Sequence, residues 1–353
     1  MISFGLLGCG RIAARHAELL GKGAIGGARL SAVCDVVGER ARQYGERFAV
    51  PALDDPERLF AHPNIDVVSI LTPSGLHVRH AAAAARAGKH VVVEKPMALR
   101  LEDADVMIRT CDQAGVKLFV VKQNRFNVPV VKLREALESG RFGRLVLGTV
   151  RVRWCRDQSY YDTEKWRGTW RFDGGVLANQ ASHHIDLLEW MMGDIDSVYA
   201  RATTALVDIE AEDTAIACLK FHSGALGVIE ATTATRPKDL EGSLSILGEK
   251  GAVEIGGFAV DRLRTWQFAD ERSIDAEIME KYAVNPPHAH GFGHQAYYQH
   301  VVDCLANGRS ALVDGLEGRK SLELISAMYE SIETGNEIHL RFQPKRCRLG
   351  CSA

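Results

Sequence analysis

The sequence predicts an α/β protein in which an N-terminal doubly wound parallel sheet is followed by an α+β domain with a large, open-faced, mainly antiparallel sheet. Over residues 1–121, short runs of β-branched residues alternate with amphipathic helical segments. From about residue 144 the runs become longer, and apolar residues recur with a period of two. The 353 residues, 46% of them hydrophobic, suffice for two packed domains. We place these domains at residues 1–122 and 123–341, followed by a polar tail at 342–353.

The first half contains five predicted strands rich in Val, Ile and Leu: 2–7, 30–34, 67–71, 90–93 and 118–121. Between them we expect helices with apolar residues at helical spacing: 12–20, 38–48, 76–87 and 101–114. Glycine follows three of these helices, at Gly21, Gly88 and Gly115, as is typical of helix C termini. The alternation predicts crossover helices and a parallel sheet.

The second half contains longer predicted strands: 145–154, 214–221, 226–232, 242–247 and 252–255. Helices are expected at 179–192 and 315–332, with a third near 297–306. Their apolar stripes can cover one face of the second sheet. The boundary between the two domains falls near residues 122–127.

The overall charge argues against polyanionic partners. The chain has 43 basic and 45 acidic residues, a formal charge of −2, which gives no sustained field for nucleic acid or an anionic membrane. Apolar runs such as 81–85 are far shorter than the roughly 20 residues that cross a bilayer. Residues 1–5 lack the basic start of a secretory leader. We therefore expect a cytoplasmic protein that acts on a small molecule.

The eight cysteines are scattered, and no Cys-x-x-Cys pair occurs. Most lie in apolar segments, where cysteine behaves as a small hydrophobic residue. Cys347 and Cys351 lie in the polar tail without a second pair of ligands. We expect no metal site.

A glycine-rich turn, Gly8-Cys9-Gly10-Arg11-Ile12-Ala13, follows the first predicted strand. The first glycine makes a tight turn, the second lets the backbone approach a pyrophosphate, and Ala13 allows close packing of helix on strand. The helix expected to begin near Arg11 presents its N terminus to the anion. The pattern predicts a dinucleotide-binding Rossmann domain, with Arg11 and Ile12 beside the cofactor.

Asp35 ends the second predicted strand. An acid there can accept hydrogen bonds from both ribose hydroxyls of adenosine and would repel a 2′-phosphate, so NAD is favoured over NADP. The alternative is that Asp35 serves as an N-terminal acid for the helix that starts near Gly38. Arg40, close by, leaves NADP open.

The segment Thr72-Pro73-Ser74-Gly75-Leu76-His77 follows another strand at the carboxyl edge of the sheet, where doubly wound sheets bind ligands. We expect Thr72, Pro73, Ser74 and His77 near the cofactor. The alternative for His77 is that it merely begins the following helix.

Glu94-Lys95-Pro96 follows the strand 90–93 and brings the lysine to the same edge, where the nicotinamide should lie. Pro96 fixes the local backbone and discourages a helix start. A lysine at a strand end is more often a solvated surface group, but these neighbouring motifs make Lys95 a candidate catalytic residue.

The segment from Asn179 to Asp186 is expected to open an amphipathic helix after the flexible residues 173–175. Its spacing would put Asn179, His183 and Asp186 on one helical face. A histidine can take a proton from a sugar hydroxyl near neutral pH, as alcohol oxidation by NAD requires. His184 points about 100° away and is expected to pack in the core. The alternative for His183 is a structural, hydrogen-bonded histidine.

Together, the glycine turn, Thr72-Pro73, Glu94-Lys95-Pro96 and residues 174–186 resemble the glucose-fructose oxidoreductase and inositol dehydrogenase family over nearly the whole chain. The resemblance implies a Rossmann domain joined to an open-faced sheet that forms a homo-oligomer, either a dimer or a tetramer. It also implies that Lys95 contacts the substrate beside the nicotinamide and that His183 is the base.

This sequence departs from the usual helix of that family, in which an aspartate precedes the histidine by four residues and a glycine by two. Asn179 and Ala181 occupy these positions. Asn179 cannot supply a negative charge that raises the proton affinity of His183, which counts against inositol dehydrogenase.

The chain is similar to one subgroup of the family, the 3-dehydrogenases of UDP-2-acetamido-2-deoxy-D-glucuronate. The similar stretches are residues 119–125, 160–162, 166–170, 179–183, 240–243 and 291–294. Chemically, the cations of Lys122, Arg125 and Arg167 suit a carboxylate and a pyrophosphate.

The aromatic residues of these stretches suit a nucleotide sugar in the same way. Tyr160, Tyr161 and Trp166 offer flat faces for sugar or uracil. For Trp166 and Trp170, packing in the core or at an interface is the alternative.

The resemblance implies NAD-dependent oxidation of the C3 hydroxyl to a 3-keto sugar nucleotide, with His183 as base and Lys95 polarising the developing carbonyl. Such a product suits an aminotransferase that makes a diaminouronic acid for surface polysaccharide. The implied cofactor contacts are Gly8, Gly10, Arg11, Ile12, Asp35, Thr72, Pro73, Ser74, His77, Glu94, Lys95 and Gln123. The implied substrate contacts are Lys95, Lys122, Asn124, Arg125, Tyr160, Trp166, Arg167, Asn179, Ser182 and His183.

Two rival functions remain. One is a dehydrogenase or ketoreductase for a free sugar, a polyol or another nucleotide sugar. The other is a non-catalytic NAD sensor on the same fold, which the presence of both Lys95 and His183 argues against.

Overall fold

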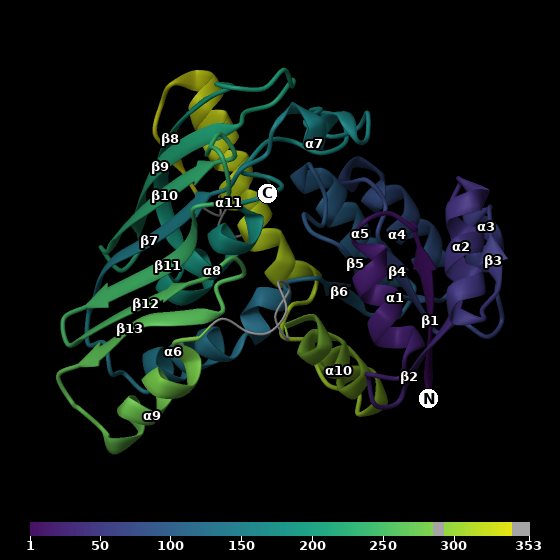
Figure 1. Ribbon diagram of the computed structural model, residues 1–353, viewed down its shortest axis with the longest axis horizontal. Helices are drawn as coiled ribbons and strands as arrows, with labels where there is room; N and C mark the ends of the chain where they lie inside the picture. Colours follow the sequence, from purple (N-terminus) through teal and green to yellow (C-terminus); the bar gives the residue numbers. More distant parts are fainter. Residues whose placement is uncertain (285–292, 341–353) are drawn as a thin grey trace, which may run out of the picture.

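The computed structural model describes residues 1–284 and 293–340, which build two sheets with helices between them (Figure 1). Sheet A is wholly parallel, with the strand order β3-β2-β1-β4-β5-β6. Its strands are β1 (Ile2–Leu7), β2 (Ala28–Cys34), β3 (Ala52–Leu53), β4 (Val67–Ile70), β5 (His90–Val93) and β6 (Leu118–Val120). The predicted doubly wound sheet is confirmed.

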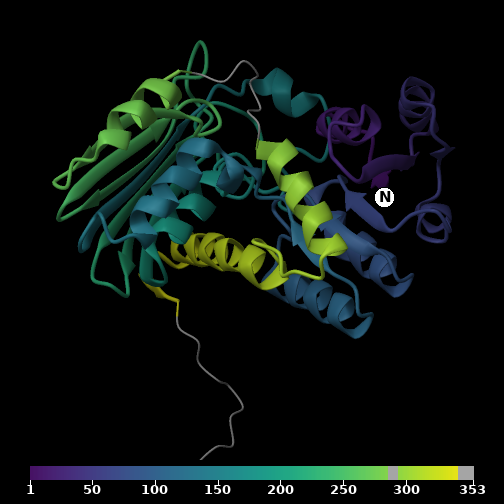
Figure 2. The same ribbon diagram turned by 90° about the horizontal axis from the view of Figure 1, so that it is seen from below.

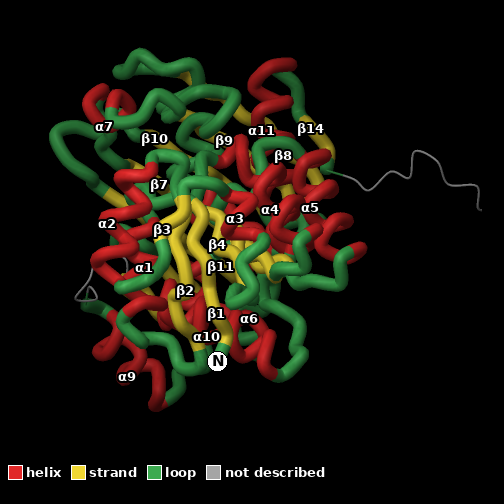
Figure 3. Tube along the Cα trace, turned by 90° about the vertical axis from the view of Figure 1, so that its right-hand side faces the viewer, coloured by secondary structure: helices red, strands yellow, loops and turns green. Residues whose placement is uncertain are grey.

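Helices cover both faces of sheet A (Figure 3). They are α1 (Ala13–Gly21), α2 (Gly38–Phe48), α3 (Pro56–Phe60), α4 (His77–Arg86) and α5 (Leu101–Gln113), with a 3-10 turn η1 (Ser74–Leu76) before α4. Helices α1 and α2 contribute to one core, and α3, α4 and α5 to the other. The predicted bounds agree within two residues, but β3 and α3 were missed because two- and five-residue elements carry too little periodicity.

Sheet B has the order β13-β12-β11-β7-β10-β9-β8-β14, and its neighbours are antiparallel except for the pair β10 and β7. Its strands are β7 (Leu145–Arg153), β8 (Ile195–Thr203), β9 (Thr214–Phe221), β10 (Leu226–Thr232), β11 (Glu241–Gly248), β12 (Gly251–Gly256), β13 (Arg262–Phe268) and β14 (Ile338–His339). The mainly antiparallel sheet is confirmed, although β8, β13 and β14 were not predicted. The first four residues of β8 are all buried, so the alternation that marks a half-exposed strand is missing there.

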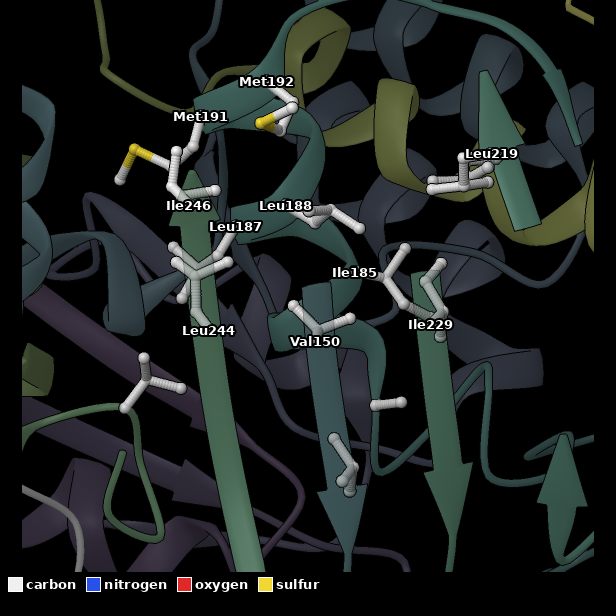
Figure 4. Close-up of a cluster of buried hydrophobic side chains, with 14 of the residues drawn as sticks. Val150, Ile185, Leu187, Leu188, Met191, Met192, Leu219, Ile229, Leu244 and Ile246 are labelled. Carbon is white, nitrogen blue, oxygen red and sulfur yellow. The ribbon is translucent and has the colours of Figure 1, made fainter. Parts of the chain in front are cut away.

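One face of sheet B is covered by α8 (Ser182–Met192), whose Ile185 and Leu188 lie against Val150 of β7 and Ile229 of β10 (Figure 4). The remaining helical segments are η2 (Gln123–Phe126), α6 (Val128–Glu138), α7 (Gln158–Asp162), α9 (Ser273–Tyr282), α10 (Gly293–Ala306) and α11 (Gly315–Thr334). Of these, η2, α6, α7 and α9 were not predicted.

Helix α11 spans both halves of the molecule (Figure 2). A Cβ at Gly318 would lie 2.5 Å from Val120 of β6, so this glycine allows the helix to approach sheet A closely. Farther along the helix, Ile325 and Met328 are buried in the core beneath sheet B. The helix therefore connects the two sheets.

Helix α10 lies elsewhere than expected. Its Tyr297 and Tyr298 are buried in the core of sheet A, and the Tyr298 ring meets that of Phe4 edge to face at 5.5 Å between centroids. The expectation that this helix covers the second sheet was wrong, because an apolar stripe shows that a helix face is buried without showing against which sheet.

The other face of sheet B carries exposed apolar side chains along β8, β9 and β10. Ile216 is 57% exposed and Leu226 is 56% exposed. On neighbouring strands, Val228 of β10 is the register partner of Cys218 of β9, and Cys218 is the register partner of Tyr199 of β8. Among the described helices, none covers this face along β7 to β10 (Figure 1). The face agrees with the open-faced sheet that was predicted.

Within the described ranges, no helix has both the length and the apolar character needed to cross a bilayer. The six cysteines found there are free thiols. Cys347 and Cys351, and Gly291 and Phe292 of the predicted motif, lie outside the described residues, as does the predicted tail from residue 342.

Candidate active site

The predicted cofactor and catalytic motifs meet at the carboxyl edge of sheet A. The glycine turn follows β1, Asp35 follows β2, Thr72 follows β4, and Glu94 and Lys95 follow β5. Because β1 and β4 are neighbours at the centre of the sheet, these loops surround the point where the strand order reverses.

The glycine turn has the shape that a dinucleotide requires. Gly8 has φ +101°, and a Cβ there would lie 2.8 Å from the carbonyl oxygen of Leu71. No heavy atom lies within 4 Å of a Cβ built at Gly10, so the space above this backbone is open. Arg11 is exposed and Ile12 half-buried, and α1 begins after them at Ala13. The turn fits a pyrophosphate at the N terminus of α1.

Asp35 is buried beside this turn, where its two carboxylate oxygens accept hydrogen bonds from backbone N–H groups. Oδ2 accepts from Cys9 at 2.7 Å, and Oδ1 from Val37 at 2.8 Å. Asp35 therefore links the glycine turn to Val37, the residue before α2, although no side chain caps that helix. Arg40 pairs with Glu164 at 2.7 Å, which engages the cation that could have met a 2′-phosphate.

The Thr72–His77 segment holds two loops together. The His77 ring is 1% exposed, and its nitrogens lie 2.9 Å from the carbonyl oxygen of Pro96 and 2.8 Å from that of Thr72. Burial lowers the pKa of His77. Because both ring nitrogens face backbone carbonyls, the ring joins the Thr72 loop to the Lys95–Pro96 loop, and its predicted contact with the cofactor is untested. Ser74 is buried, and η1 begins there.

Glu94 is buried in a polar cluster that the sequence reasoning missed. Its Oε1 lies 3.0 Å from His16 Nε2, and His16 Nδ1 lies 2.6 Å from the hydroxyl of Tyr298. Burial would raise the pKa of Glu94, but His16 brings it down to about 2. His16, Glu94 and His294 place potential metal ligands within 4.8 Å of one another, and the structure describes no other such group. A histidine on the apolar face of the first helix was the available signal for this cluster.

Lys95 is held by Asn179. Its Nζ donates to the carbonyl oxygen of Asn179 at 2.8 Å and to Oδ1 at 3.1 Å. Burial lowers the pKa of Lys95, and the negative charges of Glu94 and Asp173 act in the opposite direction.

Helix α8 begins at Ser182, three residues later than expected. Asn179 therefore lies in the preceding turn, and the prediction that it shares a helical face with His183 was wrong. Residues 176–180 form a turn of their own, in which the carbonyl of Gly175 accepts from Asn179 N at 3.0 Å and that of Val176 from Ala181 N at 2.8 Å. The Ser182 hydroxyl donates to the carbonyl oxygen of Asn179 at 2.9 Å.

His183 points toward the end of β6. Its Nε2 lies 3.0 Å from Gln123 Nε2, so the glutamine amide donates and the imidazole accepts. Burial, followed by the charges of Lys95 and Lys122, lowers the pKa of His183 well below its ordinary value. The ring is therefore neutral at physiological pH, with a lone pair able to accept a proton. His184 is buried edge to face against Trp154.

Two of the three predicted substrate cations are committed to an ion-pair cluster. Arg125 donates to both carboxylate oxygens of Asp186 at 2.8 Å and to Glu317 at 2.9 Å. Lys122 Nζ lies 3.4 Å from Asp186 and donates to Ser321 at 2.9 Å. Burial would raise the pKa of the Asp186 carboxyl, but Arg125 and Lys122 keep it below its usual value. Asn124, beside them, is also buried.

The third cation, Arg167, belongs to a stack of aromatic and guanidinium groups. Its guanidinium lies over the rings of Tyr160 and Trp166, 4.6 and 4.8 Å from their centroids, and donates to the Tyr160 hydroxyl at 2.8 Å. The guanidinium of Arg156 lies over the rings of Trp154 and Tyr160 and forms an ion pair with Asp239. Arg156 was missed, although its spacing from Tyr160 was visible in the sequence.

The aromatic residues next to this stack pack in the core or at its margin. Tyr161 is buried, and its hydroxyl lies 3.1 Å from that of Thr233. Trp170 is 49% exposed and meets Tyr329 edge to face.

Comparison with known proteins identifies relatives along the whole chain. Residues 2–122 match the family model described as "Oxidoreductase family, NAD-binding Rossmann fold", and residues 134–340 match "Oxidoreductase family, C-terminal alpha/beta domain". The WlbA dehydrogenase of Bordetella pertussis, solved with NADH and UDP-GlcNAcA, is 43% identical, with a TM-score of 0.90 over 97% of this chain and 98% of that one.

Two further relatives cover the chain almost completely. The WlbA dehydrogenase of Chromobacterium violaceum, also solved with NADH and UDP-GlcNAcA, is 43% identical, with a TM-score of 0.90 over 97% of each chain. A myo-inositol 2-dehydrogenase of Thermotoga maritima is 34% identical over 95% of this chain and 98% of its own length.

Asp35 should set the preference for NAD. We expect the unmodified protein to bind NAD at least ~10-fold more tightly than NADP, because a 2′-phosphate would stand against the buried carboxylate. Asp35→Ser should narrow that ratio, as measured by titrating each dinucleotide against intrinsic fluorescence. Asp54→Asn, which removes an exposed carboxylate nearby, is the matched control. Tighter binding of NADP by the unmodified protein would contradict this role.

Proposed function

The chain belongs to the oxidoreductase family of the glucose-fructose oxidoreductase, inositol dehydrogenase and MocA type, and we propose that it oxidises the C3 hydroxyl of UDP-2-acetamido-2-deoxy-D-glucuronate. At the level of class it is an NAD-dependent dehydrogenase of sugars or polyols. The finer assignment rests above all on 43% identity over nearly the full length to two proteins solved with NADH and UDP-GlcNAcA.

Bound NAD supplies the hydride acceptor, held by the glycine turn and Asp35. Lys95 polarises the oxygen that becomes the carbonyl. Two of its three N–H groups are directed to Asn179, so the third is left to donate to the substrate oxygen. As negative charge develops on that oxygen, the ammonium stabilises it.

His183 removes the hydroxyl proton. Its Nε2 faces Gln123 and carries the lone pair, so the substrate hydroxyl takes the place of the glutamine amide as the donor. The cations of Lys95 and Lys122 lower the proton affinity of the ring. A substrate that carries a carboxylate and a pyrophosphate brings negative charge to the same place and offsets that effect.

Arg167 is our candidate for recognition of the uronate carboxylate. Lys122 and Arg125 are already paired with Asp186, whereas the hydrogen bonds described for Arg167 go to hydroxyl groups of Thr163 and Tyr160. Its planar guanidinium suits a carboxylate, and the rings of Tyr160 and Trp166 beside it offer faces for sugar or uracil. The product, a 3-keto nucleotide sugar, has the carbonyl that an aminotransferase of surface-polysaccharide synthesis would use.

The main alternative is a dehydrogenase of a free polyol. The 34% identity to a myo-inositol 2-dehydrogenase supports it. The Asn179 position argues against it, because the polyol-type aspartate before the histidine is absent.

We also propose that the open face of sheet B pairs with a second copy of this chain. The exposed Leu226 and Val228 share that face with Arg151 and Glu230, which are register partners of opposite charge. In a twofold dimer the same surface of each subunit meets its copy. A surface with an apolar centre and both positive and negative charges at its edge can therefore complement itself.

His183→Asn should lower the turnover number at least ~100-fold, because loss of a general base typically costs ~10²–10⁴. Lys95→Met should be comparably damaging. Both variants should still bind NAD, and His222→Asn, a surface histidine, should behave like the unmodified protein. Stopped-flow absorbance of NADH formation gives the rates. Near-normal turnover in a folded His183 variant would remove the residue from the mechanism.

UDP-2-acetamido-2-deoxy-D-glucuronate should reduce NAD more than ~10-fold faster than UDP-N-acetylglucosamine, because an unpaired cation commonly costs ~2–5 kcal/mol. Arg167→Gln should erase most of that preference, while Arg171→Gln, at an exposed neighbouring arginine, should keep it. The comparison uses kcat/KM from NADH absorbance. If free myo-inositol or glucose serves as well as the UDP-uronate, the polyol alternative replaces this proposal.

The sheet pairing predicts that Ile216→Glu and Val228→Glu, together, lower the molar mass measured by light scattering during size-exclusion chromatography. Two buried carboxylates at a former apolar interface are costly to desolvate. Leu316→Glu replaces an exposed apolar residue on α11 and should leave the mass unchanged. An unmodified protein that is already monomeric would refute the pairing.

A further inference from the structure

A chain of hydrogen bonds runs from Lys95 through Asn179 to Asp173. Lys95 Nζ donates to Asn179 Oδ1 at 3.1 Å, and Asn179 Nδ2 donates to Asp173 Oδ1 at 2.5 Å. The second oxygen of Asp173 accepts from the backbone N–H of Gly168 at 2.9 Å. Asp173 is only 1% exposed, so these partners satisfy a carboxylate that water does not reach.

The direction of this chain depends on the carboxylate. An asparagine amide has a donor end and an acceptor end, and the two are nearly equal in shape. An ionised carboxylate only accepts, so it holds the Nδ2 end of Asn179 toward itself and leaves Oδ1 for Lys95. With the amide reversed, an N–H group would face the ammonium of Lys95, and one acceptor of Lys95 would be lost.

We propose that Asp173 is a positioning residue of the reaction: its carboxylate fixes the Asn179 amide with Oδ1 toward Lys95, so that Lys95 directs its remaining N–H to the substrate oxygen. The inference deepens the proposed function, since it assumes that Lys95 acts on the substrate. Asp173 itself need not touch the substrate.

The same carboxylate supports the substrate-binding turn. The N–H that it accepts belongs to Gly168, which follows Trp166 and Arg167 and has φ +68°. One buried side chain therefore sets both the orientation of Asn179 and the turn that carries Arg167.

Protonation of Asp173 would reverse the amide, because a carboxylic acid offers an O–H donor to Asn179. Burial raises the pKa of Asp173 to about 6. The Gly168 N–H, the charges of Arg167 and Lys95, and the Asn179 amide act in the opposite direction and lower it. Tyr161 is a further titratable group beside Asp173. Acidification below this pKa protonates the Asp173 carboxylate, which the orientation of Asn179 requires in its charged form. Activity should therefore fall as the pH drops through about 6. In the ligand-free protein the pKa of His183 lies well below its ordinary value, so His183 does not account for a decline in kcat/KM, which reports groups of the free enzyme.

An exchange of the two side chains tests the proposal. Asp173→Asn keeps an acceptor for Gly168 but turns an N–H toward Asn179, which must then reverse its amide. We expect kcat to fall about 10- to 100-fold, as for a misplaced catalytic group, with KM for the nucleotide sugar changed much less. Asn179→Asp alone places two carboxylates in hydrogen-bond contact and should also be impaired.

The double variant Asp173→Asn with Asn179→Asp restores every donor and acceptor in the opposite order. The amide at 173 donates to the carboxylate at 179, which accepts from Lys95. We expect its kcat to exceed that of both single variants, because the two positions are in contact and their effects are not additive. The carboxylate now at position 179 also raises the proton affinity of His183, so the decline on acidification shifts rather than disappears. A purely structural role for Asp173 predicts no such rescue, and melting temperatures of all variants show which ones remain folded.

A second readout does not require the substrate. Competitive acetylation of the whole protein, followed by mass spectrometry, gives the pKa of Lys95 from its reactivity at several pH values. Asp173→Asn should lower that pKa, because a negative charge that raises it is removed, and the double variant should raise it again.

The outcomes separate the two proposals. Equal Lys95 titration in all variants, or a folded Asp173→Asn enzyme with unmodified kcat, overturns the positioning role. If UDP-uronate is not oxidised by the unmodified protein but the Lys95 titrations follow the expected order, the substrate assignment fails and the positioning of Lys95 stands.

Discussion

The position of the active site depends on one buried ion-pair cluster. Asp186 of α8 is 1% exposed and is matched by Arg125 and Lys122, which follow β6 of sheet A, while Glu317 of α11 closes the cluster. An uncompensated charge at such a depth would be strongly destabilising, so α8 has little freedom to move away from the end of β6. His183 lies one turn before Asp186 on the same helix. The pairing therefore fixes the proposed base, which belongs to the second domain, beside the lysine that belongs to the first.

Sequence patterns predicted the parts of the site that follow from local rules. Parallel strands end at one edge, so Gly8, Asp35, Thr72 and Lys95 could be brought together from strand predictions alone. The role of Arg125 could not be predicted, because a cation suited to a substrate carboxylate is equally suited to a buried aspartate 61 residues away. Asn179 was misplaced for a related reason. Helical spacing was extended back to Asn179, whereas residues 176–180 form a separate turn and α8 begins only at Ser182.

The charges around the site act on the protonation of the proposed base. Burial, followed by the charges of Lys95 and Lys122, lowers the pKa of His183, and Arg167 is close enough to affect Lys95 and Asp173. If the proposed substrate binds there, its negative charges would offset the effect of Lys95 and Lys122 on the proton affinity of His183.

The packing of α10 also bears on how the chain acquires its structure during synthesis. Phe4 and Leu6 of the first strand share a core with Tyr297 and Tyr298, which are translated nearly 300 residues later. At elongation rates of about 5–20 residues per second, the Rossmann sheet would wait roughly 10–40 s after the completion of β6 before this side of its core could close. Throughout that interval an apolar face of the nascent sheet is open to other chains. The two domains are therefore a single unit for biogenesis, and a fragment ending near residue 122 would emerge from the ribosome as a client for chaperones.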